Sequence, residues 1–319
     1  MKTNLWFVIP CYNEDQILEH TIHQIDYLVN DLQRQVLISE ESKVVLVDDG
    51  SKDNTWSIIS RKSREDSRYI GIKLSRNKGH QNALLAGMTY ASGKCDCIIS
   101  MDADLQDDIN VVPKFLEAYQ QGYQIVYGVR NNRDTDTKFK KNTASLFYKF
   151  MKFLGAETVD NHADFRLMSK QALQALSEFK EANLFLRGIV PLIGLKSTVV
   201  YYERQERLAG ETKYPLKKMI SFAMDGITSF SVKPLRVISL LGIICSGLST
   251  LGLLYALISY IANVTVPGWT AIVCSIWLLG GVQLLCLGVV GEYIGKIFSE
   301  VKQRPRFIIE EIISVEKYT

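Results

Sequence analysis

The chain has 319 residues, of which 47% are hydrophobic and 22% are charged, and its formal net charge is only +3. This weak positive balance, without a basic stripe of interleaved aromatic residues, argues against a nucleic-acid partner. The mean hydropathy of +0.03 is high for a soluble enzyme and low for a polytopic transporter, so it indicates a soluble domain with a small membrane portion.

The N-terminal part, up to about residue 130, alternates apolar strands with helix-like segments, which predicts an α/β domain with a parallel-dominated sheet. We expect strands at 5–9, 44–47, 70–74 and 97–100, and a last strand of this part at 125–129. The first strand begins within a few residues of Met1 without a charged and apolar leader. We therefore expect this domain to stay in the cytosol.

A polar, turn-forming cluster follows each of the first four strands. Ligands of open α/β sheets gather at the carboxyl ends of the strands, so these clusters predict one shared site. After the strand at 97–100, Asp102 and Asp104 are two residues apart and would point the same way in an extended chain, with Gln106 next on that face. Because Mg²⁺ joins one or two carboxylates to substrate phosphates, this segment predicts a metal–diphosphate site. A solvated acidic turn is the alternative.

The C-terminal part has the features of a membrane hairpin. Uncharged apolar runs at 237–262 and 269–290 each exceed the roughly 18 residues that suggest a spanning helix. Basic residues flank the pair and the connecting loop carries no charge, so the positive-inside rule places both chain ends in the cytosol. The segments 138–154 and 215–232 mix basic with apolar or aromatic residues, as helices at a membrane surface do.

We therefore expect a cytosolic domain at 1–214, an amphipathic interfacial segment at 215–234, two transmembrane helices within 235–293 and a cytosolic tail at 294–319. This organisation predicts a multi-pass protein of the cell membrane whose catalytic domain and termini are all cytosolic.

Four motifs, in this order, resemble glycosyltransferase family 2. They are Ile-Pro-Cys-Tyr-Asn-Glu at 9–14, Val-Asp-Asp-Gly-Ser-x-Asp-x-Thr at 47–55, Asn-x-Gly at 77–79 and Asp-Ala-Asp-Leu-Gln-Asp at 102–107. The fit narrows to the polyprenyl-phosphate glycosyltransferases, relatives of dolichol-phosphate mannose synthase and bactoprenol glucosyltransferase. The resemblance implies a Rossmann-like GT-A domain for a nucleotide-sugar, followed by amphipathic interfacial helices and a two-helix transmembrane hairpin.

The resemblance also implies the substrates, which are a UDP-sugar donor and a polyprenyl phosphate acceptor such as undecaprenyl phosphate. It implies Mg²⁺ or Mn²⁺ on Asp102 and Asp104, with Gln106 as a further metal or phosphate contact. The nucleoside would contact Pro10, Tyr12, Glu14, Asp48 and Asp49, and Asp49 is favoured over Asp48 for the uracil N–H.

Asp164 matches a family position near the sugar. The acceptor is a phosphate monoester with a second pKa of about 6, so it is already mostly anionic and needs no strong base. We therefore expect Asp164 to orient a substrate, and we expect direct attack to invert the anomeric carbon.

Basic residues in two later segments are expected to bind the acceptor phosphate, because arginine forks suit phosphate oxygens. The segment from 204 to 214 resembles the family's Arg-x-x-Gly-x-Ser-Lys-Tyr, with Thr212 in place of serine. The set comprises Arg130, Arg133, Arg204, Arg207 and Lys213.

Several alternatives stay open from the sequence. Glucose is the favoured sugar and N-acetylglucosamine the second choice. A processive polysaccharide synthase would normally carry Gln-x-x-Arg-Trp and more membrane spans. A membrane scaffold with a degenerate transferase domain would not need the intact acidic motifs. Glycines in both apolar runs, together with a possible edge strand at 307–313, suggest a homo-oligomer.

Overall fold

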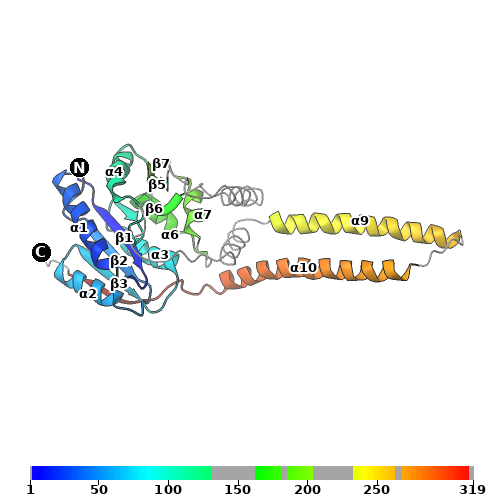
Figure 1. The fold of residues 1–319 in the computed structure, drawn as a ribbon. Helices are drawn as coiled ribbons and strands as arrows, with labels where there is room; N and C mark the ends of the chain where they lie inside the picture. The colour runs from blue at the N-terminus through cyan, green and yellow to red at the C-terminus, as the bar shows by residue number, and fades with distance from the viewer. Residues whose placement is uncertain (1, 131–161, 182–184, 204–232, 263–267, 316–319) are drawn as a thin grey trace. The chain divides into compact units, whose positions relative to one another are not determined.

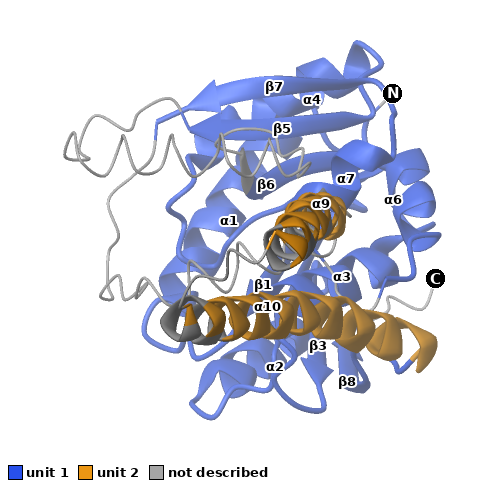
Figure 2. Cartoon of the chain, turned by 90° about the vertical axis from the view of Figure 1, so that its right-hand side faces the viewer, with its two compact units in different colours: residues 1–142, 158–213, 304–319 blue, residues 143–157, 214–303 orange. Residues whose placement is uncertain are grey.

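The computed structural model describes residues 2–130, 162–181, 185–203, 233–262 and 268–315. The chain divides into two compact units, which Figure 2 shows in different colours. The first comprises residues 1–142, 158–213 and 304–319, and the second comprises residues 143–157 and 214–303. The end of the chain therefore belongs to the same unit as its beginning.

One eight-stranded sheet, ordered β7-β5-β6-β4-β1-β2-β3-β8, is the centre of the first unit. β1 pairs in parallel with β2 and β4, β2 with β3, and β5 with β7, whereas β6 is antiparallel to β4 and β5, and β8 to β3. The predicted parallel-dominated α/β architecture is confirmed. The strands are β1 (Leu5–Cys11), β2 (Lys43–Asp48), β3 (Tyr69–Leu74), β4 (Cys97–Ser100), β5 (Ile125–Arg130), β6 (His162–Ser169), β7 (Ser197–Tyr202) and β8 (Ile309–Ser314).

The strand predicted at 125–129 is β5, the last strand of the N-terminal part, and later segments of the chain add β6, β7 and β8 to the same sheet. β6 lies between β4 and β5, and β7 covers the outer side of β5. β6 is difficult to recognise from the sequence, because this strand carries two buried charged residues, Asp164 and Arg166, at positions where apolar residues are expected. β8 is an edge strand as predicted, but its partner is β3 of the same chain.

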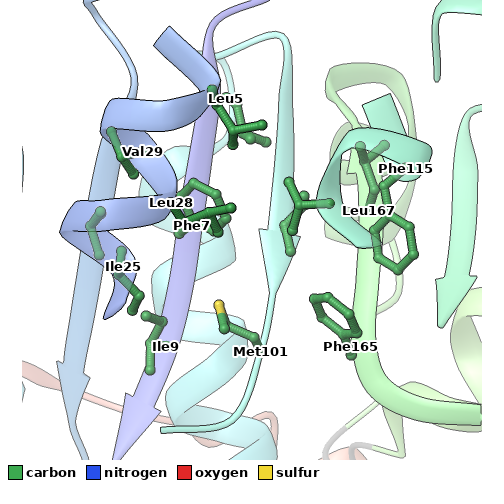
Figure 3. Close-up of a cluster of buried hydrophobic side chains, with 14 of the residues drawn as sticks. Leu5, Phe7, Ile9, Ile25, Leu28, Val29, Met101, Phe115, Phe165 and Leu167 are labelled. Carbon is green, nitrogen blue, oxygen red and sulfur yellow. The ribbon is translucent and has the colours of Figure 1, made fainter. Parts of the chain in front are cut away.

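Helices cover both faces of the sheet (Figure 1). α1 buries a stripe of apolar residues at helical spacing, among them Leu18, Ile22 and Ile25. Figure 3 shows Ile25, Leu28 and Val29 of this helix beside Phe7 and its neighbours on β1. Among the described residues of this unit, the α-helices are α1 (Leu18–Arg34), α2 (Thr55–Glu65), α3 (His80–Ala91), α4 (Val112–Gln120), α6 (Lys170–Ser177) and α7 (Leu186–Leu192).

The core continues from β1 to β6 below the carboxyl ends of the strands. The rings of Phe115 on α4 and Phe165 on β6 lie 4.8 Å apart, and both are fully buried (Figure 3). Burial of each such side chain contributes roughly 1.5–3 kcal/mol. On the other face, α3 approaches β1 closely because Gly87 has no side chain there, and a Cβ would lie 2.4 Å from Val8 Cγ1. This packing fixes the strand ends that carry the polar clusters.

The second unit contains two long helices that contact each other, α9 (Lys233–Ile261) and α10 (Trp269–Val301). α10 begins where the second apolar run was predicted to begin, but it continues past residue 290. Glu292, Lys296 and Glu300 recur at helical spacing among apolar residues, and such a pattern continues a helix instead of ending it.

Among the described residues, one helical segment is long and apolar enough to cross a membrane, Leu278–Val301, and Leu235–Ile244 is a shorter apolar segment. Large apolar side chains such as Leu248 and Leu284 are exposed along both helices. The predicted surface helices at 138–154 and 215–232 lie outside the described residues.

Candidate active site

Polar residues meet at one edge of the sheet, where β1, β2 and β4 end. The parallel register pairs Cys11 with Asp48, and Val8 with Ser100, so the segments after these strands begin side by side. The Asp49 N–H also donates to the Cys11 carbonyl over 2.9 Å. The ends of β1, β2 and β4, which the sequence predicted to share a site, therefore lie side by side, and the site itself stays a prediction.

The segments after β1 and β2 are joined by hydrogen bonds between side chains and backbone. The Asn13 N–H donates to Ser51 Oγ (3.0 Å), and the Glu14 N–H donates to Thr55 Oγ1 (2.8 Å). Asn13 adopts a φ of 54°, which asparagine tolerates better than most residues. Sequence reasoning missed Asn13, Ser51 and Thr55, although such residues are the usual turn formers.

The predicted nucleoside residues of this region lie together. Pro10 is buried near the end of β1, whereas Tyr12 is 40% exposed and Glu14 is half-buried. An exposed aromatic ring beside ordered backbone is suited to stack on a base.

Asp48, the last residue of β2, and Asp49, which follows it, are both buried, and both carboxylates accept hydrogen bonds from backbone N–H groups. Asp48 accepts the N–H of Ser51 at 3.2 and 3.3 Å. Asp49 accepts the N–H groups of Lys78 (2.7 Å) and Gly79 (2.8 Å), so it connects β2 to the segment after β3. Burial raises the pKa of both carboxyl groups, and these hydrogen bonds limit the rise. Asp49 thus orders the loops at this edge, and its uracil contact stays a prediction.

The acidic segment after β4 is turned, not extended as the sequence analysis assumed. Leu105 adopts a φ of 47°, and the Gln106 N–H donates to Asp104 Oδ1 over 3.3 Å. Asp102 and Asp104 are both half-buried and separated by the buried Ala103, whereas Gln106 is only 4% exposed. Asp102 and Asp104 are therefore both partly accessible, and the metal contacts of Asp102, Asp104 and Gln106 stay predictions.

The surroundings of Asp102 suit a cation. Its Oδ1 atom is buried and accepts no hydrogen bond from the described residues, although His80 Nε2 lies 3.4 Å from it. Burial raises the pKa of the Asp102 carboxyl to about 6 against the lowering effect of His80, and the Asp164 carboxylate adds to the rise. Crowded carboxylates with an unsatisfied oxygen fit a divalent ion whose remaining ligands come from substrate phosphates. The described residues contain no cluster of three or more His, Cys, Asp or Glu side chains able to bind a metal by themselves.

Asp164 on β6 lies between two arginines. Arg166 Nη2 donates to its Oδ1 over 2.5 Å, and Arg187 donates to both carboxylate oxygens, from Nε over 3.3 Å and from Nη2 over 3.1 Å. Burial raises the pKa of the Asp164 carboxyl, but the two guanidinium groups outweigh burial and hold this pKa well below its usual range. Asp164 is therefore ionised and a poor proton acceptor, which suits an orienting role.

His80, at the start of α3, faces both acidic groups. Its Nε2 atom is 3.4 Å from Asp102 Oδ1 and 3.7 Å from Asp164 Oδ2. The sequence analysis assigned no role to His80, Arg166 or Arg187. The Asn-x-Gly motif that precedes His80 could have pointed to this histidine, whereas no motif pointed to the two arginines.

Arg130, the predicted phosphate ligand at the end of β5, is held by two buried groups. Its Nη2 and Nε atoms donate to Asp107 Oδ1 over 2.8 and 3.1 Å. The Tyr202 hydroxyl donates to the same oxygen over 2.5 Å. Sequence reasoning missed Asp107 and Tyr202.

The other predicted phosphate ligands lie outside the described residues, so their roles stay predictions. They are Arg133, Arg204, Arg207 and Lys213.

Comparison with known proteins gives two family matches. The family described as Glycosyl transferase family 2 matches residues 6–177, and the one described as GtrB C-terminal hairpin matches residues 233–297. The chain is 53% identical over 306 residues to the uncharacterized glycosyltransferase YkoT of Bacillus subtilis, covering 96% of this chain and 91% of the relative.

Two further relatives carry functional names. The chain is 37% identical to the prophage bactoprenol glucosyl transferase homolog of Escherichia coli, covering 98% of this chain and 99% of the relative. It is 38% identical to the SfII prophage-derived bactoprenol glucosyl transferase of Shigella flexneri, covering 98% of each chain. These similarities include both the sheet domain and the two long helices.

Proposed function

The chain belongs to glycosyl transferase family 2, and we propose that it transfers glucose from UDP-glucose to a polyprenyl phosphate such as undecaprenyl phosphate. Its sheet domain is GT-A-like. The end-to-end similarity to bactoprenol glucosyl transferases supports this sugar and this carrier. The product would be a membrane-bound lipid-phosphate sugar for decoration of cell-envelope glycans.

The observation that carries the proposal is that acidic and basic side chains lie at the same edge of the sheet. Asp102 and Asp104 offer carboxylates to a cation, while Arg130 and Arg187 offer guanidinium groups to an anion. A reaction between a nucleoside diphosphate-sugar and a phosphate monoester brings several negative charges together. Such a reaction needs a cation for the departing diphosphate and fixed donors for the attacking phosphate.

Asp102 and Asp104, with Gln106, would hold Mg²⁺ or Mn²⁺, which when bound acts as a Lewis acid on the diphosphate leaving group. Tyr12 and Glu14 would bind the nucleoside, with Pro10 shaping the pocket and Asp49 accepting the uracil N–H. Asp48 would support this loop through its bonds to the Ser51 N–H.

An oxygen of the acceptor phosphate attacks the anomeric carbon as the bond from that carbon to the UDP oxygen breaks. The phosphate is the nucleophile and is already anionic near neutral pH, so no protein base has to remove a proton. Asp164, kept ionised by its two arginines, orients a substrate. Attack opposite the leaving group converts an α-linked donor into a β-linked lipid phosphate.

The membrane-bound substrate requires a site near the bilayer. We propose that α9 and α10 form a transmembrane hairpin with both ends cytosolic, because Lys233 and Arg236 begin the first helix and Lys302 and Arg304 follow the second. Arg130, with Arg133, Arg204, Arg207 and Lys213, would then bind the lipid phosphate at the membrane surface.

A panel of labelled nucleotide-sugars tests this function. The full-length protein in detergent micelles with undecaprenyl phosphate and Mg²⁺ is given UDP-glucose, UDP-N-acetylglucosamine and GDP-mannose in turn. We expect lipid-linked label from UDP-glucose at the highest kcat/KM. A higher kcat/KM with another donor would contradict the choice of glucose. Long glycan chains would indicate a processive synthase, and no turnover of any donor would indicate a degenerate domain.

A further inference from the structure

Arg130 is held in place by a carboxylate that is itself fixed. Asp107 is only 3% exposed, and its Oδ1 atom accepts hydrogen bonds from Arg130 and from the Tyr202 hydroxyl. Arg130 Nε also lies 3.3 Å from the Tyr202 hydroxyl oxygen. The three side chains come from β5, β7 and the segment after β4. The Nε–Nη2 edge of the guanidinium is therefore fixed, while the side chain as a whole stays 29% exposed.

Arg187 on α7 is likewise held by a buried carboxylate. Its Nε and Nη2 atoms bind the two oxygens of Asp164, which is buried, and its side chain is 38% exposed. Asp164 is also paired with Arg166, a fully buried residue. Two positive charges thus face one negative charge, and the partly exposed member of the pair is Arg187.

The two arginines belong to one place in the fold. β5 and β6 are antiparallel, so the end of β5 at Arg130 lies beside the beginning of β6, where Asp164 holds Arg187. Burial lowers the pKa of the Arg187 guanidinium, but the Asp164 carboxylate and, more weakly, Asp102 outweigh it, so this pKa is raised overall, and the positive charge of Arg130 opposes the rise. An anion between them would relieve the repulsion between the two guanidinium groups.

We propose that Arg187 joins Arg130 in binding the acceptor phosphate, and that Asp107 and Tyr202 are positioning residues that act through Arg130. This inference rests on the function proposed above. Within the described residues, the hydrogen bonds of both arginines use Nε and Nη2, and both side chains stay partly exposed, at 29% for Arg130 and 38% for Arg187. Fixed guanidinium donors lose little conformational freedom when they bind a phosphate.

The acceptor phosphate is favoured over the donor diphosphate because of where the cluster lies in the chain. β5 and β7 place Arg130 opposite Tyr202 in register, and Tyr202 ends the strand just before the segment at 204–214, which contains the predicted acceptor ligands. The donor diphosphate is expected at Asp102 and Asp104. UDP affinity therefore separates the two assignments.

The first experiment replaces each arginine by lysine, which keeps the charge and removes the fork. For Arg187→Lys and Arg130→Lys we expect the KM for undecaprenyl phosphate to rise about tenfold or more, with UDP affinity by calorimetry unchanged. Arg68→Lys is the matched control, because Arg68 is similarly exposed (27%) and is held by Asp26 and Asp66 at the opposite ends of the strands. We expect this control to leave both quantities unchanged.

The second experiment tests positioning. Tyr202→Phe removes only the hydroxyl, and we expect it to raise the acceptor KM about two- to tenfold. Because Tyr202 acts through Arg130, the same change made on top of Arg130→Lys should add nothing. Asp107→Asn should behave in the same way, and unchanged UDP affinity shows that each variant is folded.

An unchanged acceptor KM in Arg187→Lys, or a loss of UDP affinity in its place, overturns the role of Arg187. An equal effect of Tyr202→Phe in both backgrounds overturns its role as a positioning residue. Failure of the unmutated protein to form any lipid-linked sugar is a separate result, because it overturns the proposed function itself.

Discussion

Asp49→Asn should weaken UDP binding through the loop that follows β3. The Asp49 carboxylate binds the N–H groups of Lys78 and Gly79 over 2.7 and 2.8 Å, and it is 2% exposed. An asparagine keeps one acceptor and turns an NH₂ group toward the other N–H. The loss of one charge-assisted hydrogen bond costs roughly 1.5–3 kcal/mol.

The loop after β3 cannot shift easily to compensate for this loss, because Gly50 packs directly against it. A Cβ at Gly50 would lie 2.6 Å from the Asn77 backbone nitrogen, so the two loops are already in close contact. If the same loops form the uracil pocket, UDP affinity should fall about ten- to a hundredfold, at 1.4 kcal/mol per decade.

Calorimetry with UDP on the full-length protein in detergent measures this effect. Asp66→Asn is the control, because Asp66 binds Arg68 and Lys62 at the opposite ends of the strands. We expect the control to lower thermal stability and to leave UDP affinity unchanged. If Asp49→Asn binds UDP as tightly as the unmutated protein, Asp49 is not part of the nucleotide site.

Three further changes test other parts of the account. Asp104→Ala should abolish transfer at every Mg²⁺ or Mn²⁺ concentration while the protein stays folded, and activity near the unmutated level would remove the metal from the mechanism. Gly87→Ala should destabilise the sheet domain by roughly 1–3 kcal/mol, because the new Cβ overlaps Val8, and Val8→Ala should restore part of the lost stability in thermal melts. A cysteine at Lys302, in a chain without its native cysteines, should escape impermeant reagents in intact cells, and its labelling would contradict the topology.

The sequence predicts those parts of the site that come from local patterns. Apolar runs followed by Asp49 or Asp102 identify strand ends, and parallel pairing brings these ends together. The turn at Leu105 is different, because its positive φ depends on how the segment packs and not on its residue type. For this reason the extended chain assumed for Gln106 was wrong.

Contacts between distant segments are absent from the sequence pattern. Asp107 accepts a hydrogen bond from Tyr202, which is 95 positions away in the chain. Arg187 binds Asp164 on β6, a strand that its charged residues make difficult to recognise from the sequence. β8 closes the edge of the sheet from the far end of the chain, so its pairing with β3 could not be read from local periodicity.

The most direct test of the central claim is the chemical identity of the product. The purified full-length protein is placed in lipid vesicles that contain undecaprenyl phosphate and is supplied with radiolabelled UDP-glucose and Mg²⁺. The account predicts label in the lipid fraction as β-linked glucosyl phosphate, with one UDP released for each sugar transferred. Label found only as free glucose in the aqueous phase, or an α-linked lipid product, would contradict it.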